Sequence, residues 1–264
     1  MAALTVLGYL ANEPERLACA LHELRSTLTT PPDCHGHGVA HFVDDRLLLN
    51  TRPSPVTTGT SVEELVGPLK TSTLLVNVHT DGDGGPYKFR SWAFSLQGSA
   101  GRAEARTRLM ERLPDFLLRN ISSDSLGEAA FHRFLSFLHE DHKVDDPMVD
   151  GPTVVRAMRQ TLEMMAPAGE ERAGPLCLVA TNGRLLVCAH KGGGVAYSLR
   201  EGILACQRCQ MDRHVLDSFP VRESHRRFRG VVLVGGMAQT PTGFITVPDN
   251  KSVLITRKLD VQLV

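Results

Sequence analysis

The sequence predicts an α+β protein in which two β-sheets stack and helices cover their outer faces. Three observations lead to this class. Strand patterns open the chain, helical patterns occupy its centre, and strand patterns return from Pro175 onward. A hairpin signal at Asn182-Gly183 divides one apolar run into two antiparallel strands. No linker-like stretch separates these parts, so we expect a single domain over residues 1–264.

The N-terminal elements follow from apolar spacing and capping residues. The apolar run at 4–10 predicts a buried strand, and the spacing within 13–28 predicts a helix with Pro14 in its first turn. Ser61 followed by Glu64 is a capping box, which predicts that a short helix begins there.

Strands and a charged segment follow. Runs of β-branched and apolar residues predict strands within 39–53, 71–80 and 91–99. The first of these runs contains a turn at Asp44-Asp45 and therefore predicts two short strands. The charged stretch 101–120 is expected to be partly helical, with an interruption at Pro114.

Two amphipathic helices are predicted in the centre of the chain. The first covers 122–142 with a cap at Ser123 or Asp124, and the second covers 151–165. The remaining segments are predicted strands, and these cover 175–190 as a hairpin, 193–200, 228–236, 243–250 and 252–259.

Charge and composition exclude several function classes. The 29 Lys and Arg residues balance 29 Asp and Glu residues, so we expect no nucleic-acid partner. The chain has no apolar run long enough to span a bilayer, and its N-terminus lacks the basic segment of a secretory signal. Six scattered cysteines do not form a disulfide framework in a chain of 264 residues. We therefore expect a soluble cytoplasmic protein with no membrane partner and no cofactor.

Cys206-x-x-Cys209 is the first candidate metal-ligand group. His214 follows closely, so two thiolates and an imidazole could share a zinc ion. A fourth ligand is not evident, although Cys188, His190 or His225 could fold near. Because a second cysteine pair at matching spacing is missing, the pattern favours a surface loop with two reduced thiols, and we assign no metal site.

A second candidate group is Cys34-His35-Gly36-His37 with His41. The three histidines share parity, so they point the same way if the segment is extended. Histidines are also common in polar loops, and no carboxylate lies nearby in sequence. We therefore expect no metal ion at this group.

Five segments, in chain order, resemble the motifs of the class II glutamine amidotransferases, a family of N-terminal-nucleophile enzymes. The resemblance covers nearly the whole chain and is to the small single-domain branch. The matching segments are the opening at 5–14, His35–Phe42 beside the family's Asp-Gly-Trp-Gly strand, Leu75–Thr80 beside its Ala-His-x-Arg strand, Trp92–Gly98 beside its Ala-His-Asn-Gly segment, and Ser123–Ser125 beside its Thr-Asp-Ser-Glu helix start. The resemblance implies a four-layer αββα sandwich of the N-terminal-nucleophile (Ntn) hydrolase type.

The resemblance also implies a chemistry that this sequence lacks. Enzymes of the family use an N-terminal cysteine whose thiolate attacks the glutamine amide while its own amine serves as the base. Counting back from Gly8 places Leu4 at that position. Thr5 carries a hydroxyl, but neighbouring strand residues face opposite sides, so Thr5 would point away from the side that Leu4 faces.

The substrate-binding positions change as well. His79 stands where the family has an arginine that grips the substrate carboxylate, and Gln97 stands where it has the oxyanion-hole asparagine. Gly98 and Asp124 match the family's residues. We therefore expect a pseudoenzyme that serves as a protein-interaction or regulatory module. The alternatives are a sensor that binds a small amide or amino acid at Asp124, Gln97 and His79, and a hydrolase that uses a non-cysteine nucleophile or a metal held by the histidines.

Overall fold

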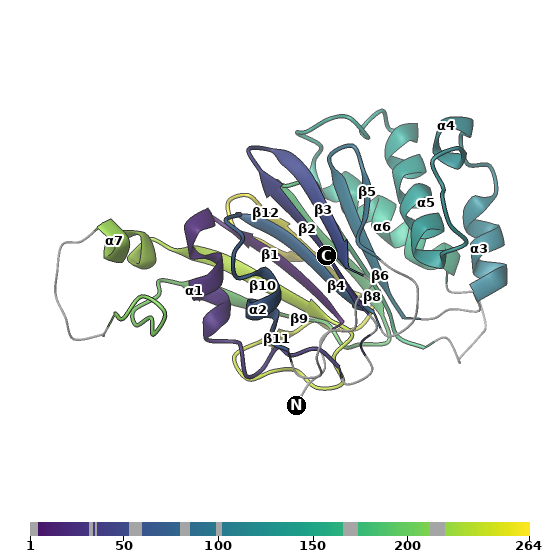
Figure 1. Ribbon diagram of the computed structural model, residues 1–264. Helices are drawn as coiled ribbons and strands as arrows, with labels where there is room; N and C mark the ends of the chain where they lie inside the picture. Colours follow the sequence, from purple (N-terminus) through teal and green to yellow (C-terminus); the bar gives the residue numbers. More distant parts are fainter. Residues whose placement is uncertain are drawn as a thin grey trace.

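The computed structural model describes residues 5–31, 34, 36–52, 60–79, 85–98, 102–165, 174–211 and 220–264. Two antiparallel sheets stack face to face, and helices cover the outer side of each (Figure 1). Helices α1 (Leu17–His22) and α2 (Val62–Val66) lie on one sheet. Helices α5 (Leu126–Glu140) and α6 (Gly151–Met165) lie on the other. The predicted α+β class and the αββα order are confirmed.

The first sheet has seven strands in the order β11-β9-β10-β1-β4-β2-β3. Their bounds, in chain order, are β1 Val6–Ala11, β2 Gly36–Val43, β3 Arg46–Arg52, β4 Thr73–His79, β9 Ala196–Glu201, β10 Arg229–Gly235 and β11 Ile245–Thr246. β1 lies in the middle of this sheet and pairs with β4 and β10 on its two sides.

The second sheet has six strands in the order β13-β12-β8-β7-β6-β5. Their bounds are β5 Tyr87–Phe89, β6 Trp92–Gln97, β7 Leu176–Thr181, β8 Leu185–Lys191, β12 Ser252–Thr256 and β13 Val261–Leu263. The shorter helical elements are a 3-10 turn at Pro14–Arg16, α3 Arg102–Met110, α4 Asp115–Leu118 and α7 Pro220–Arg226.

Most local signals of the sequence are confirmed. The Asn182-Gly183 turn joins β7 to β8, with Gly183 at φ +85° and the Asn182 side chain accepting from two backbone N–H groups beyond it. The Ser61 and Glu64 side chains form both bonds of the capping box. Pro114 separates α3 from α4, as expected.

Two predicted helix ends need correction. The helix expected over 13–28 is a 3-10 turn followed by an α-helix that ends at His22. The central helix is capped by Ser125, whose side chain accepts from the backbone N–H of Glu128, and not by Ser123 or Asp124. The Ser123 hydroxyl instead donates to the Glu128 carboxylate, so it fixes the segment before the helix and does not cap the first turn.

Apolar side chains fill three layers. One lies between α1, α2 and the first sheet, one between the two sheets, and one between the second sheet and the helices α3 to α6. All six residues of β1 are buried because its alternate side chains enter two of these layers. Leu7 and Tyr9 face the α1 side, whereas Val6 and Leu10 face the second sheet.

Among the helices of the described residues, none is both long and apolar enough to cross a membrane.

Leu135 tests how tightly α5 packs on the second sheet. Its side chain is 0% exposed, so we expect Leu135→Ala to lower the free energy of unfolding by about 2–5 kcal/mol. Leu204, which is 64% exposed, is the matched control, and Leu204→Ala should change it by less than about 0.5 kcal/mol. Urea denaturation measures both. Equal, small effects would contradict this packing.

Candidate functional site

A polar cluster lies at one end of the layer between the sheets, beside the start of β1. On β4, Asn77 and His79 have the parity of Leu75, which is part of the inter-sheet core. On β6, Gln97 has the parity of Ala93, which is part of the same core. The structure therefore directs His79 and Gln97, two positions chosen from the sequence, into one layer from facing sheets.

The amide of Gln97 takes part in hydrogen bonds within the fold. Its Nε2 donates to the backbone carbonyl of Thr5 at 3.2 Å and lies 3.5 Å from the carbonyl of Val78. The side-chain amides of Gln97 and Asn77 are in contact. Asn77 is 1% exposed, so this contact is shielded from water. Gln97 thus ties β6 of the second sheet to β4 and to the start of β1.

Thr5 is fixed by the first sheet. Its Oγ1 donates to the carbonyl of Gly235 at 2.9 Å, and its own carbonyl also accepts from Val78 N at 2.8 Å. Gly236 has φ +73°, and a Cβ atom there would lie 1.7 Å from Thr5 Oγ1. The hydroxyl therefore lies directly against the end of β10. Leu4 lies outside the described residues, so its place in the nucleophile position stays a prediction.

The two remaining positions of the predicted pocket differ in their surroundings. Gly98 has φ +103°, and a Cβ atom there would lie 1.9 Å from the carbonyl oxygen of Pro175. This close backbone approach explains why only glycine fits. Asp124 is fully exposed and forms an ion pair with Arg106 at 3.3 Å, whereas Gln97 is half-buried.

Glu128 is a buried charged group that the sequence analysis did not single out. Its carboxylate accepts four hydrogen bonds of 2.6–3.0 Å from the backbone N–H and hydroxyl groups of Ser122 and Ser123. Burial raises the pKa of this carboxyl, but the four hydrogen bonds outweigh burial, and the net pKa is lowered. The spacing of Ser125 and Glu128, which is typical of a capping box, is the sequence signal that could have identified Glu128. Glu128 holds the segment that carries Asp124.

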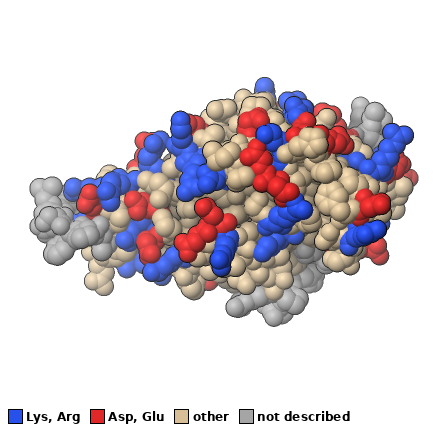
Figure 2. Space-filling view, turned by 90° about the horizontal axis from the view of Figure 1, so that it is seen from above, with Lys and Arg blue, Asp and Glu red and all other residues tan. Residues whose placement is uncertain are grey.

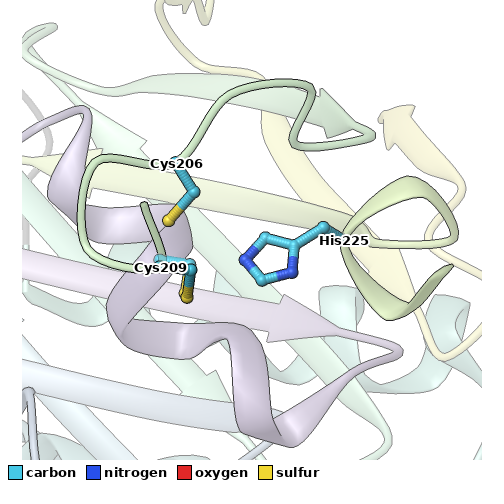
Figure 3. Close-up of side chains that lie close together, drawn as sticks. Cys206, Cys209 and His225 are labelled. Carbon is cyan, nitrogen blue, oxygen red and sulfur yellow. The ribbon is translucent and has the colours of Figure 1, made fainter. Parts of the chain in front are cut away.

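A second group of polar side chains lies on the other side of the first sheet. The ligand atoms of Cys19, Cys206, Cys209 and His225 all lie within 4.8 Å of one another. Figure 3 shows the side chains of Cys206, Cys209 and His225 close together, with the His225 ring extending toward the two cysteines. The loop is exposed at Gln207, Arg208 and Gln210 and both thiols are free, as expected, but the Cys206 side chain is buried and that of Cys209 is half-buried.

The sequence identified part of this group and missed its most distant member. His225 was one of three residues considered as a fourth ligand, whereas His214 lies outside the described residues. Cys188 contacts Cys177 in the inter-sheet core, and His190 Nε2 bonds to the carbonyl of Pro248. Cys19 was missed because its place on the buried side of a helix is equally typical of a core residue.

The candidate histidine group has a different setting. His37 and His41 lie on the same face of β2 as Val39, as their parity predicted. His37 lines a groove of about 330 Å³ between β2, β3 and α2. His41 is buried, and burial lowers its pKa. Within the described part of the chain, His37 and His41 join no group of three or more metal-ligating side chains. His35 lies outside the described residues.

Glu128→Gln tests the role of the carboxylate at the start of α5. Losing the charge should lower the free energy of unfolding by about 1–3 kcal/mol at neutral pH. Because the folded-state pKa is lowered, the stabilisation is complete above the ordinary glutamate pKa of about 4.3 and is lost as the pH falls through the folded value.

Thermal unfolding of wild type and Glu128→Gln over the acid range measures this effect. The difference in Tm between the two proteins should disappear as the pH falls through the folded-state pKa of Glu128. Glu163→Gln, on an exposed position of α6, is the control and should follow wild type. A difference that stays constant with pH would contradict an ionised Glu128.

Comparison with known proteins shows where this architecture occurs. No family model matches the chain, and no curated protein matches it in sequence. A glutamine aminotransferase class-II domain protein from Silicibacter pomeroyi matches in structure with a TM-score of 0.57 at 14% identity, over 98% of this chain and 97% of that one. A predicted glutamine amidotransferase from Pseudomonas aeruginosa matches with a TM-score of 0.55 at 13% identity, over 98% and 95%.

A longer protein contains the same architecture. The glutamine phosphoribosylpyrophosphate amidotransferase from B. subtilis, complexed with ADP and GMP, matches with a TM-score of 0.53 at 15% identity. The match covers 98% of this chain and 48% of that one. At this low identity the likeness concerns the fold. The chain thus has the fold of the class II glutamine amidotransferases, which the order of its sequence segments predicted.

Proposed function

We propose that this chain has the amidotransferase fold without glutaminase chemistry and acts as a protein-interaction or regulatory module. One observation carries the proposal, namely that the amide at the oxyanion-hole position is engaged within the fold. Gln97 Nε2 donates to the carbonyl of Thr5 and contacts the amide of Asn77.

An oxyanion hole needs N–H groups aimed at the point where negative charge develops in the transition state. The Gln97 amide is directed instead toward the backbone of Thr5, which is itself tied to β4. Redirecting this amide to a substrate would remove one of the donors to the Thr5 carbonyl in a half-buried place, which is costly. This arrangement supports a structural role for Gln97.

None of Cys19, Thr5 and Leu4 matches the N-terminal cysteine nucleophile of the family. Cys19 is the first cysteine of the sequence, and it lies in α1, in the layer on the other side of the first sheet from Gln97. The hydroxyl of Thr5 donates to the carbonyl of Gly235 and lies against Gly236. Leu4, at the position implied by the resemblance, carries only hydrocarbon.

Three considerations support a role in binding a protein. The fold makes up about half of the longer B. subtilis amidotransferase, so a domain of this shape can work beside a second unit. In the family that the sequence resembles, the domain delivers ammonia to a partner enzyme. Figure 2 shows basic and acidic side chains interspersed on one face, in keeping with equal numbers of both. Mixed charge suits a protein partner better than a polyanion.

The sensor hypothesis has one supporting observation, since His79 and Gln97 enter the same inter-sheet layer. Against it, the Gln97 amide is engaged and Asp124 is exposed in an ion pair with Arg106. The two hypotheses differ in one measurable respect. A sensor is stabilised by its ligand in proportion to RT ln(1 + [L]/Kd), and an interaction module is not stabilised by a free amino acid.

Ammonia release from glutamine tests the absence of glutaminase activity. We expect the purified protein to release no more ammonia than a buffer blank, with or without Thr5→Ala, because neither Leu4 nor Thr5 serves as a nucleophile. We also expect no rise in Tm with glutamine, glutamate or asparagine.

Gln97→Leu should lower the free energy of unfolding by about 1–3 kcal/mol, since it removes hydrogen bonds from half-buried groups.

Three outcomes would count against the proposal. Ammonia release that disappears in Thr5→Ala would show an active enzyme. A saturable Tm rise with an amino acid, lost in His79→Ala, would favour the sensor. Affinity capture at native expression level that returns no stoichiometric partner, or one that does not bind the purified chain, would remove the interaction role.

A further inference from the structure

Four potential metal ligands converge from three separate parts of the chain. Cys19 lies in α1, Cys206 and Cys209 lie in the loop after β9, and His225 lies in α7. Cys19 and Cys209 are 190 positions apart in sequence, yet their sulfur atoms are 3.5 Å apart. Cys19 is 4% exposed, Cys206 4% and His225 0%. Such a gathering of polar side chains in an apolar layer requires an explanation.

The dimensions of the cluster suit a tetrahedral ion. With zinc–sulfur bonds of about 2.3 Å, the sulfur atoms of a tetrahedral site lie about 3.8 Å apart. The separation of Cys19 and Cys209 is within a few tenths of an ångström of that value, and all four ligand atoms lie within 4.8 Å of one another. Small side-chain adjustments would bring the set to bonding distance.

The loop that carries two of the thiols is already shaped to present them. Cys206 and Met211 exchange backbone hydrogen bonds of 3.1 and 2.9 Å, which closes a tight turn around Cys209. Gln210 adopts φ +54° within the turn. This turn holds both sulfur atoms on one side without help from an ion.

α7 places His225 by contacts that do not involve the cysteines. Arg16 Nε donates to Ser224 Oγ at 2.9 Å, and Ile203 N donates to the carbonyl of His225 at 2.8 Å. These bonds attach α7 to the start of α1 and to the end of β9. Figure 1 shows α7 at the edge of the molecule, beyond α1. The cluster is therefore the place where the connection between β9 and β10 meets α1.

We propose that Cys19, Cys206, Cys209 and His225 bind one structural zinc ion. Three thiols lose their protons to solvent on binding, and the imidazole binds through its neutral form. Four protein ligands complete a tetrahedral shell and leave no open position, which is typical of a structural and not a catalytic site. The ion would fasten the β9–β10 connection onto α1.

The surroundings fit an ion with this ligand set. Three thiolates and Zn²⁺ leave one net negative charge, and Arg25 lies beside the loop through a 3.3 Å bond to Gln207. A cavity of about 320 Å³ reaches the cluster and is lined by Cys19, Cys206 and Arg25, so an ion has a path to it. A disulfide would use only two of the three thiols and would leave the convergence of His225 unexplained. This inference does not depend on the proposed function.

Metal analysis of the full chain, purified without chelators under reducing conditions, tests the site. We expect about one zinc per chain and loss of that zinc in Cys19→Ser, Cys209→Ser and His225→Ala. Cys177→Ser is the matched control, because Cys177 and Cys188 also place two buried sulfur atoms 3.6 Å apart, away from the cluster. This variant should keep its zinc.

A second measurement uses the wild-type chain and does not depend on how variants fold. Alkylation followed by mass spectrometry should find Cys19, Cys206 and Cys209 protected, and a chelator should expose these three together and lower Tm. Protein without zinc that cannot be loaded with it, iron with visible absorption, or a disulfide between Cys19 and Cys209 under reducing purification would each overturn the zinc proposal. Zinc that persists in all three ligand variants would do so as well.

Discussion

Burial of β1 on both faces is the constraint on which the rest of the structure depends. This strand is the middle of the first sheet, and its six residues fill two different layers. Gly8 faces the second sheet closely, because a Cβ atom there would lie 2.8 Å from the Leu186 side chain, which would have to shift to admit it. The two sheets therefore meet at β1, and the residues at its start lie at a fixed place at the end of the inter-sheet layer.

The polar side chains at that end are satisfied by partners within the fold. Asn77, Ser95 and Gln97 are polar groups in a largely apolar layer, and such groups must find partners within the protein. Gln97 finds its partner in the backbone of Thr5. This hydrogen bond joins the two sheets, and the proposed loss of glutaminase chemistry rests on it.

The cysteine cluster lies on the opposite side of the first sheet, so it is independent of this polar site. The apolar layer around it contains Leu7 and Tyr9 of β1 together with Cys19 and Cys206. β1 therefore separates two polar places, one between the sheets and one beneath α1. A metal ion at the second place would act on the connection between β9 and β10, and would leave the inter-sheet layer unchanged.

The sequence by itself determined the features that depend on neighbouring residues. The Asn182-Gly183 turn, the Ser61 capping box and the shared face of His37 and His41 follow from local backbone geometry and strand periodicity. The order of strands and helices, compared with a known family, also predicted the layers of the fold. The candidate positions His79 and Gln97 followed from the same comparison.

Only the tertiary structure decided which distant side chains meet. Cys19 joins Cys209 and His225 because α1, the loop after β9 and α7 pack together, and no periodicity encodes such contacts. The hydrogen bond from Gln97 to Thr5, which are 92 positions apart in sequence, has the same origin. A local pattern specifies the face on which a side chain lies, whereas its partner is set by packing between segments that are far apart in the chain.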